Sequence, residues 1–485
     1  KRQGLHGWPE GRIKDHEYVP QLEKYVQTLI ENANGAKLIW ASTTPVTEQD
    51  KAELNKEINP TIIQRNDWAA DVMKKYNIAI NDLYGLVSAK LHLARLDRFH
   101  WNAGGYELMA NQSIEFITKE LNNSSEIPTL SDYNVLWNSP SINSLGSMPA
   151  GNGDIGINLW VEENGDLLFY LSKTDAWSEN ARLLKVGKVR LSISPNPFKT
   201  GIPFMQELIL KDGSIHIEAD ENEEHVTIDV WVDANHPVVE LNVKSGMPIS
   251  ATVTTEPWRT ERRQITGDEI HSAYGLTGDE APDVFIEKDS ILTEIDDGII
   301  WMHRNKRSVW KDNLKLQGLE EYAKQNNDPL LHRTFGGLIH SKELANTGTG
   351  KLETANSLKQ FSISVYAFTS QTETQNEWIQ QINQLAKNIE LLSRDKRFTD
   401  HKIWWKSFWN RSYIHLSTSD ENEKEKVRNV ARGYALQRYM NACSGRGNSP
   451  IKFNGSIFTV DTKNLDNRFG GFDACLLYTS PSPRD

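Results

Sequence analysis

Apolar residues in the first 121 positions alternate between helical spacing and short continuous runs. Stripes with a period near 3.6 predict helices over 22–29, 68–76 and 106–121. Short apolar runs bounded by polar residues predict buried strands over 38–41 and 78–80. Alternating strands and helices indicate a parallel sheet flanked by helices, in which active sites lie at the carboxyl ends of the strands.

A period of two replaces the helical period beyond a polar segment, 122–130, which we interpret as a linker. Apolar and polar residues alternate in successive runs from 131 to 371, for example over 226–232. Asn164-Gly165 and Asp212-Gly213 separate adjacent runs, as expected for the tight turns of hairpins. Serial hairpins over this length predict a large antiparallel β-sandwich.

The pattern becomes helical again from residue 372, with a long apolar stripe over 378–392 and a second helix over 421–443. The fold class predicted from these patterns is multidomain. It combines a partial α/β domain over 1–121, a large antiparallel sandwich over 131–371, a helical linker over 372–420 and a further helical segment over 421–474.

The composition of this 485-residue chain excludes some classes of partner. A net charge of −11 argues against nucleic acid or an anionic membrane as the main partner, and no apolar run reaches the roughly 18 residues of a membrane span. Only Cys443 and Cys475 are present, so we predict no disulfide framework, no metal site and no cofactor. The 15 tryptophans leave two interpretations open, which are core packing and stacking on sugar rings.

The candidate chemistry of the first domain is an Asp-x-x-His motif, Asp97 to His100. An aspartate at this spacing can orient a histidine that deprotonates a serine nucleophile. Two further copies occur, at Asp233–His236 and Asp268–His271, so the motif alone is weak. Their positions in the predicted fold distinguish the three copies. Asp233 follows an alternating strand, as a turn residue would, and Asp268 lies in a polar loop. Asp97 instead follows a strand–helix unit and precedes Gly104-Gly105 and a helix.

That arrangement resembles the last motif block of the SGNH (GDSL-type) hydrolases, and the strand-like segments 38–45 and 78–83 match the strands before it. The resemblance implies the C-terminal half of a flavodoxin-like esterase domain, with Asp97 and His100 as catalytic residues. The family's serine nucleophile and oxyanion-hole residues would lie upstream of Lys1. The implied reaction of the parent is ester hydrolysis, such as deacetylation of a polysaccharide. The alternative is that Asp97 caps the helix that follows.

A second resemblance rests on Met148-Pro149-Ala150-Gly151-Asn152-Gly153-Asp154-Ile155-Gly156. This motif is similar to the opening of the N-terminal β-sandwich in six-hairpin glycosidases, especially glycoside hydrolase family 95. Segments 404–414 and 433–455 resemble the linker and first helix of the (α/α)6 barrel of that family. The family's catalytic carboxylates would lie deeper in the barrel than this chain extends.

For other polar residues of the predicted sandwich, both a structural role and a functional role stay open. Asp154 and Asp175 flank the opening motif, where related sandwiches have scaffold. Segments 301–305 and 333–336 are candidates for a cleft between sandwich and barrel, or for polar groups satisfied in an interface.

The ends of the chain lead to the expectation of a fragment. There is no initiator methionine, and residues 475–485 resemble the translation of a sequencing adapter. We therefore expect a piece of a carbohydrate-active hydrolase that joins an SGNH-type esterase to a glycosidase-like module, inactive as it stands. Its parent would be secreted or periplasmic and act on a polysaccharide or oligosaccharide. A non-catalytic carbohydrate-binding or architectural sandwich is the alternative, as is a docking role for residues 1–120. The sequence specifies neither the sugar nor the oligomeric state.

Overall fold

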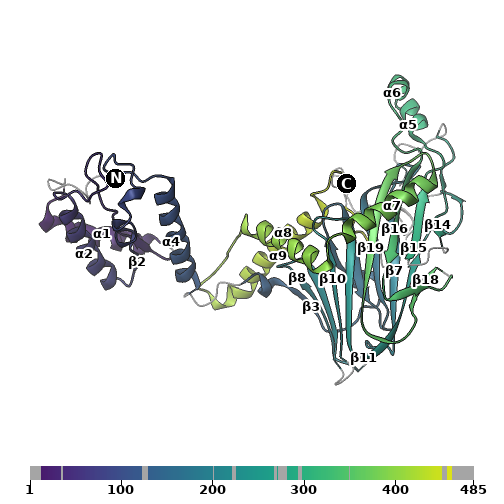
Figure 1. The fold of residues 1–485 in the computed structure, drawn as a ribbon, viewed down its shortest axis with the longest axis horizontal. Helices are drawn as coiled ribbons and strands as arrows, with labels where there is room; N and C mark the ends of the chain where they lie inside the picture. Colours follow the sequence, from purple (N-terminus) through teal and green to yellow (C-terminus); the bar gives the residue numbers. More distant parts are fainter. Residues whose placement is uncertain are drawn as a thin grey trace. The chain divides into compact units, whose positions relative to one another are not determined.

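The computed structural model divides into two compact units, Lys1–Ile127 and Pro128–Asp485, so the boundary falls inside the predicted linker. Each unit is described by itself (Figure 1). The structure describes residues 13–33, 36–122, 129–199, 201–220, 225–266, 270, 273, 281–292, 298–348, 350–449 and 456–460.

Unit 1 has the predicted alternation of strands and helices. Strands β1 (Ile39–Ala41) and β2 (Ala79–Asn81) pair in parallel, with Ile39 opposite Ala79. The helices are α1 (Asp15–Asn32), α2 (Asn59–Lys75), α3 (Leu83–Ser88) and α4 (Ala103–Asn122), and a 3-10 turn spans Leu91–Leu93.

Burial at helical spacing explains the packing of unit 1. Tyr18, Leu22 and Val26 lie on one face of α1 and are almost fully buried against α2 and both strands. Helix α4 is fastened to β2 by polar contacts. Asn81 donates to Ser113 Oγ over 3.1 Å and accepts from Gln112 Nε2 over 2.8 Å.

Unit 2 is built on a 15-stranded antiparallel sheet, which folds into two halves that share one long strand, β11 (Val238–Glu256). The first half of β11 pairs with β10 and β19, and its second half pairs with β7 and β18. A register shift between Lys244 and Ile249 separates the two pairings, as a β-bulge does when a strand turns a corner. The two halves enclose one large hydrophobic core, so the predicted sandwich is present.

The strands follow the predicted hairpin order. They are β3 (Val135–Trp137), β4 (Met148–Gly151), β5 (Ile155–Val161), β6 (Leu167–Trp177), β7 (Leu183–Ser194), β8 (Phe204–Ile209), β9 (Ser214–Ala219), β10 (Val226–Val232), β11, β12 (Arg263–Gln264), β13 (Phe285–Ile286), β14 (Ser290–Leu292), β15 (Gly298–Arg304), β16 (Arg333–His340), β17 (Leu344–Asn346), β18 (Lys351–Thr354) and β19 (Leu358–Gln371). The turns at Gly165 (φ +93°) and Gly213 (φ +62°) confirm the two predicted hairpin turns.

Three long helices follow or flank the sandwich, and two short ones, α5 (Trp310–Leu316) and α6 (Glu320–Gln325), precede β16. Helix α7 (Gln375–Glu390) lies over β16 and β19 (Figure 1), where Trp378 and Ile382 are fully buried. Helix α8 (Arg394–Asn410) buries one residue per turn, Arg397, His401 and Trp405, against the sandwich. Segment 372–420, predicted as a linker, therefore also covers the sheet.

The predicted barrel segment spans 421–474. Within its described residues, the α-helix is α9 (Lys424–Ser444). Its buried face carries Ala431, Ala435 and Ala442, whose small side chains permit close approach to the sandwich. The adapter-like tail and Cys475 lie outside the described residues.

Candidate functional site

Asp97 and His100 are in contact in unit 1. His100 Nδ1 lies 2.9 Å from Asp97 Oδ2, and the other carboxylate oxygen accepts the backbone N–H of His100 over 2.9 Å. These hydrogen bonds, the backbone bond first, hold the pKa of Asp97 below its ordinary value. Because an ionised carboxylate only accepts hydrogen bonds, the contact places a proton on Nδ1, and in the neutral form of the imidazole Nε2 then carries the lone pair. The imidazole is 61% exposed, so that lone pair is accessible to a ligand.

The backbone around this pair is unusual. Leu96 and Arg98, on either side of Asp97, adopt left-handed conformations with φ of +64° and +79°. Non-glycine residues pay for this conformation, and such strain is often found at functional sites. The helix-cap alternative is not what the structure has, because Asn102 Oδ1 accepts the Gly105 N–H over 3.0 Å and thereby caps α4.

The Asp97–His100 loop lies beside the segment that leaves the carboxyl end of β1. The backbone N–H of Thr47 donates to Arg98 O over 3.1 Å, and that of Asp50 donates to Leu96 O over 2.9 Å. Ser42, the first residue after β1, donates to Asp82 Oδ1, directly after β2. The pair therefore lies near the edge of the parallel sheet where ligands usually bind.

Within the described residues, Nε2 of His100 has no hydrogen-bond partner, so no serine hydroxyl is held against it there. No group of three or more His, Cys, Asp or Glu side chains in the same residues could hold a metal ion. What unit 1 offers chemically is an oriented imidazole able to accept a proton.

The other two Asp-x-x-His copies differ. Asp233 forms the predicted turn between β10 and β11, where its Oδ2 lies 3.1 Å from His236 Nδ1. Its carboxylate is fully buried and also 3.4 Å from Arg397 Nη1, which ties it to α8. The third copy, at Asp268 to His271, lies outside the described residues except for Ile270.

The glycine-rich motif of unit 2 is a joint between the sandwich and the end of α9. The N–H of Gly153 donates to Cys443 O over 2.8 Å, and a Cβ on Gly151 would lie 2.8 Å from that same oxygen. Asn152 donates to Asp233 O and His236 O over 2.8 and 2.9 Å. The motif therefore consists of small residues because two chain segments meet there.

Tryptophans and acidic residues near this joint have structural partners. Trp405 stacks on Tyr439 with ring centroids 5.3 Å apart, and no tryptophan in the described part of the chain is exposed. Core packing is thus favoured over an exposed sugar-stacking surface. Asp154 and Asp175 both bind the ammonium of Lys173, at 2.7 and 2.9 Å, which agrees with the scaffold interpretation.

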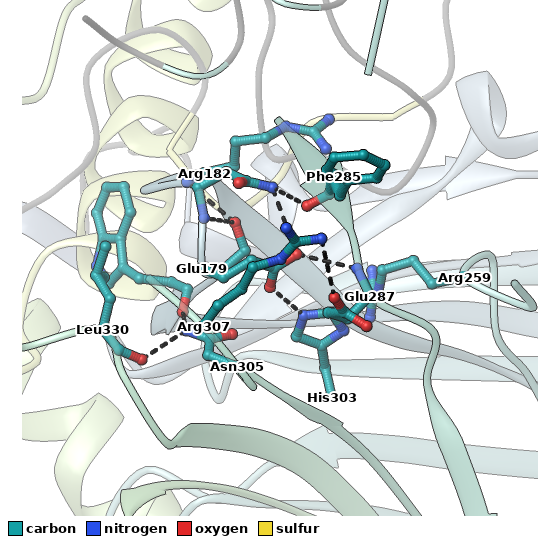
Figure 2. Close-up of polar contacts among 12 residues, drawn as sticks. Glu179, Arg182, Arg259, Phe285, Glu287, His303, Asn305, Arg307 and Leu330 are labelled. Carbon is teal, nitrogen blue, oxygen red and sulfur yellow. Dashed lines mark hydrogen bonds and ion pairs between the residues drawn. The ribbon is translucent and has the colours of Figure 1, made fainter. Parts of the chain in front are cut away.

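A buried polar network occupies the sandwich where segment 301–305 was expected to contribute to a cleft (Figure 2). His303 is fully buried, with Nε2 2.8 Å from Glu179 and Nδ1 2.9 Å from Asp289. Arg259 Nε lies 2.8 Å from Asp289, so a second cation balances the two carboxylates. Both ring nitrogens of His303 and both carboxylate oxygens of Glu179 have hydrogen-bond partners, which supports the scaffold interpretation of this segment. Among the described residues, the second carboxylate oxygen of Asp289 is buried without a hydrogen-bond partner.

The charges of this network shift its pKa values in opposite directions. Burial alone would lower the pKa of His303, but attraction to Glu179 and hydrogen bonds to both carboxylates raise it to about 9. Burial would likewise raise the pKa of Glu179, but His303 holds it below the ordinary value. The sequence indicated His303 but not Glu179 or Asp289, which lie in loops with no distinguishing pattern.

Helices among the described residues give no candidate for a membrane span. None of the curated proteins matches the sequence. Among solved structures, the fold is similar to a protein described as a kojibiose phosphorylase from the human microbiome, with 9% identity and a TM-score of 0.40 over 68% of this chain and 44% of that one. It is also similar to a bacterial glucoamylase complexed with acarbose, with 9% identity and a TM-score of 0.27 over 57% of this chain and 41% of that one.

The chain thus spans less than half the length of either solved structure. A family model described as a domain of unknown function (DUF5703) matches residues 136–414, which form the sandwich with α7 and α8. Since the match covers more than half of the 485 residues, the chain belongs to the DUF5703 family.

Proposed function

We propose that this chain is part of a carbohydrate-active hydrolase in which unit 1 contributes the acid–base pair of an ester-hydrolysing centre. The observation that carries the proposal is the Asp97–His100 pair, with its 2.9 Å contact and its exposed imidazole on a strained loop. In this role His100 Nε2 takes the proton of a serine nucleophile and later gives it to the leaving alcohol. Asp97 fixes the tautomer and stabilises the imidazolium that forms.

We further propose that unit 2 is the sandwich and the beginning of the helical barrel of a glycosidase-like module. Support comes from the resemblance of the Met148–Gly156 motif and from the observed seating of α9 on that motif. The substrate class that suits both parts is an acetylated polysaccharide or oligosaccharide. A histidine base acts in acyl transfer together with a nucleophile and oxyanion donors, so the proposed centre requires both beside His100.

The test compares the chain with the complete reading frame of its gene, using acetylated xylan and 4-nitrophenyl acetate. In the complete protein, His100→Ala should abolish acetate release, and Asp97→Asn should reduce kcat by a factor on the order of 10⁴, as expected when the wrong tautomer is held. His92→Ala, an exposed histidine of the same unit, is the matched control and should leave the rate unchanged. Full activity in His100→Ala, or turnover by the chain alone that survives this substitution, would refute the role of the pair.

A further inference from the structure

A polar pocket of about 300 Å³ lies on the outer face of the sandwich, where α7 ends and α8 begins. Its floor is a row of cross-strand neighbours, since His340 of β16 is opposite Ser364 of β19, and Ser364 is opposite Glu240 of β11. Residues directly opposite one another in a sheet have side chains on the same face. In the adjacent row, Leu338 and Tyr366 lie under α7, so the sheet surface changes from apolar to polar where the helix ends.

The charged groups around the pocket are largely paired with one another. The fully buried Glu240 binds Arg397 at 2.6 Å and Arg394 at 2.7 Å, through its two carboxylate oxygens. Glu390 lies 2.7 Å from His340 Nδ1 and accepts the Tyr366 hydroxyl over 2.9 Å. The pocket therefore presents no large uncompensated charge, which disfavours a strongly anionic or cationic ligand.

What remains is a dense set of hydrogen-bonding groups of both kinds. Four serines line the pocket beside Arg394. One of them, Ser364, is only 4% exposed, donates to Glu240 and accepts from Arg394. Lys342 and Glu343 at the rim add an exposed donor and an exposed acceptor. Each hydroxyl of a sugar donates and accepts, so neighbouring hydroxyls match such a mixed lining. The volume is at the lower end of ligand pockets, roughly 300–1,000 Å³, and suits a single sugar residue.

We propose that this pocket binds one neutral sugar residue, as a carbohydrate-binding site of unit 2. The choice of a sugar rests on the proposed function, since it identifies the substrate as a carbohydrate. The pairing of Glu240 with α8 has a structural role as well, because it fastens the helix to the sheet. The test must therefore change the pocket without breaking that pair.

Binding is measured on the full chain by saturation-transfer NMR and calorimetry with glucose, galactose, xylose and fucose. Ser362→Tyr places a ring in the pocket, and Ser370→Tyr is its matched control on the same face of β19, outside the lining. At least one sugar should bind, about tenfold or more weakly to Ser362→Tyr and unchanged to Ser370→Tyr. Lys342→Ala, which changes an exposed side chain at the rim, should also weaken binding.

Three results would overturn the proposal. One is that none of the four sugars binds, and another is that binding persists undiminished in both Ser362→Tyr and Lys342→Ala. The third is that inorganic phosphate, glucose 6-phosphate or alanine binds while neutral sugars do not, which would identify an anion or amino-acid site. His100→Ala should leave binding unchanged, so sugar binding without ester hydrolysis in the complete protein would refute the esterase role alone.

Discussion

His303 should make unit 2 less stable in alkaline solution. Its pKa of about 9 in the folded protein exceeds the ordinary value of 6.5, so between these values the folded chain binds a proton that the unfolded chain has lost. The stabilisation is complete below pH 6.5 and is lost as the pH rises through 9. The difference between a pKa of about 9 and one of 6.5 corresponds to about 3 kcal/mol of unfolding free energy.

The assay is urea unfolding followed by tryptophan fluorescence, at pH 6.5 and pH 9.5, for the wild type and His303→Gln. Trp231 and Trp301 are fully buried in unit 2 and report on its core. Glutamine does not titrate. The stability difference between the wild type and His303→Gln, measured as the free energy of unfolding, therefore changes with pH only through the histidine. We expect that difference to shrink by about 3 kcal/mol at the higher pH.

The control is His332→Gln, because the His332 ring is 40% exposed and lies outside the network. This variant should follow the wild type at both pH values. Two results would show that His303 is not held as a cation by Glu179 and Asp289. One is a stability difference between the wild type and His303→Gln that is the same at both pH values. The other is a wild type that becomes more stable at pH 9.5.

Two further predictions concern the attachment of the helices to the sandwich. Burial lowers the pKa of His401 to about 4, so the folded protein holds this histidine neutral where the unfolded chain would protonate it. The free energy of unfolding should therefore fall by about 3 kcal/mol as the pH drops from 6.5 through 4. Urea unfolding of the wild type and of His401→Gln at several acidic pH values checks this, and a stability difference between the two proteins that does not change with pH would contradict it. Gly153→Ala should destabilise unit 2 by about 2 kcal/mol or more, because φ of Gly153 is +84° and the new Cβ would lie 2.7 Å from the backbone nitrogen of Arg446. Gly348→Ala, with φ of +80° and open space, should cost only about 1 kcal/mol in thermal unfolding, and equal losses for the two variants would mean that the contact contributes nothing.

Local patterns in the sequence were sufficient to predict most elements of both units. The hairpin from β5 to β6 follows from two alternating runs and a glycine that reaches positive φ, all within one short segment. The helix α7 follows from its apolar stripe, and the contact between Asp97 and His100 spans only three residues. Such features depend on backbone propensity and on neighbours in the chain, which the sequence displays directly.

Only the tertiary structure decided how distant segments share charge and space. Glu179 and His303 are 124 residues apart, and nothing in either local sequence indicates the other. The same is true of Glu240 with Arg394 and Arg397, whose pairing leaves a balanced pocket at the start of α8. The Met148–Gly156 motif resembled the opening of a glycosidase sandwich, but its contact with the end of α9 became clear only in the fold. Burial and Coulomb interactions depend on positions in space, and the pairing of long strands brings together residues that the sequence keeps apart.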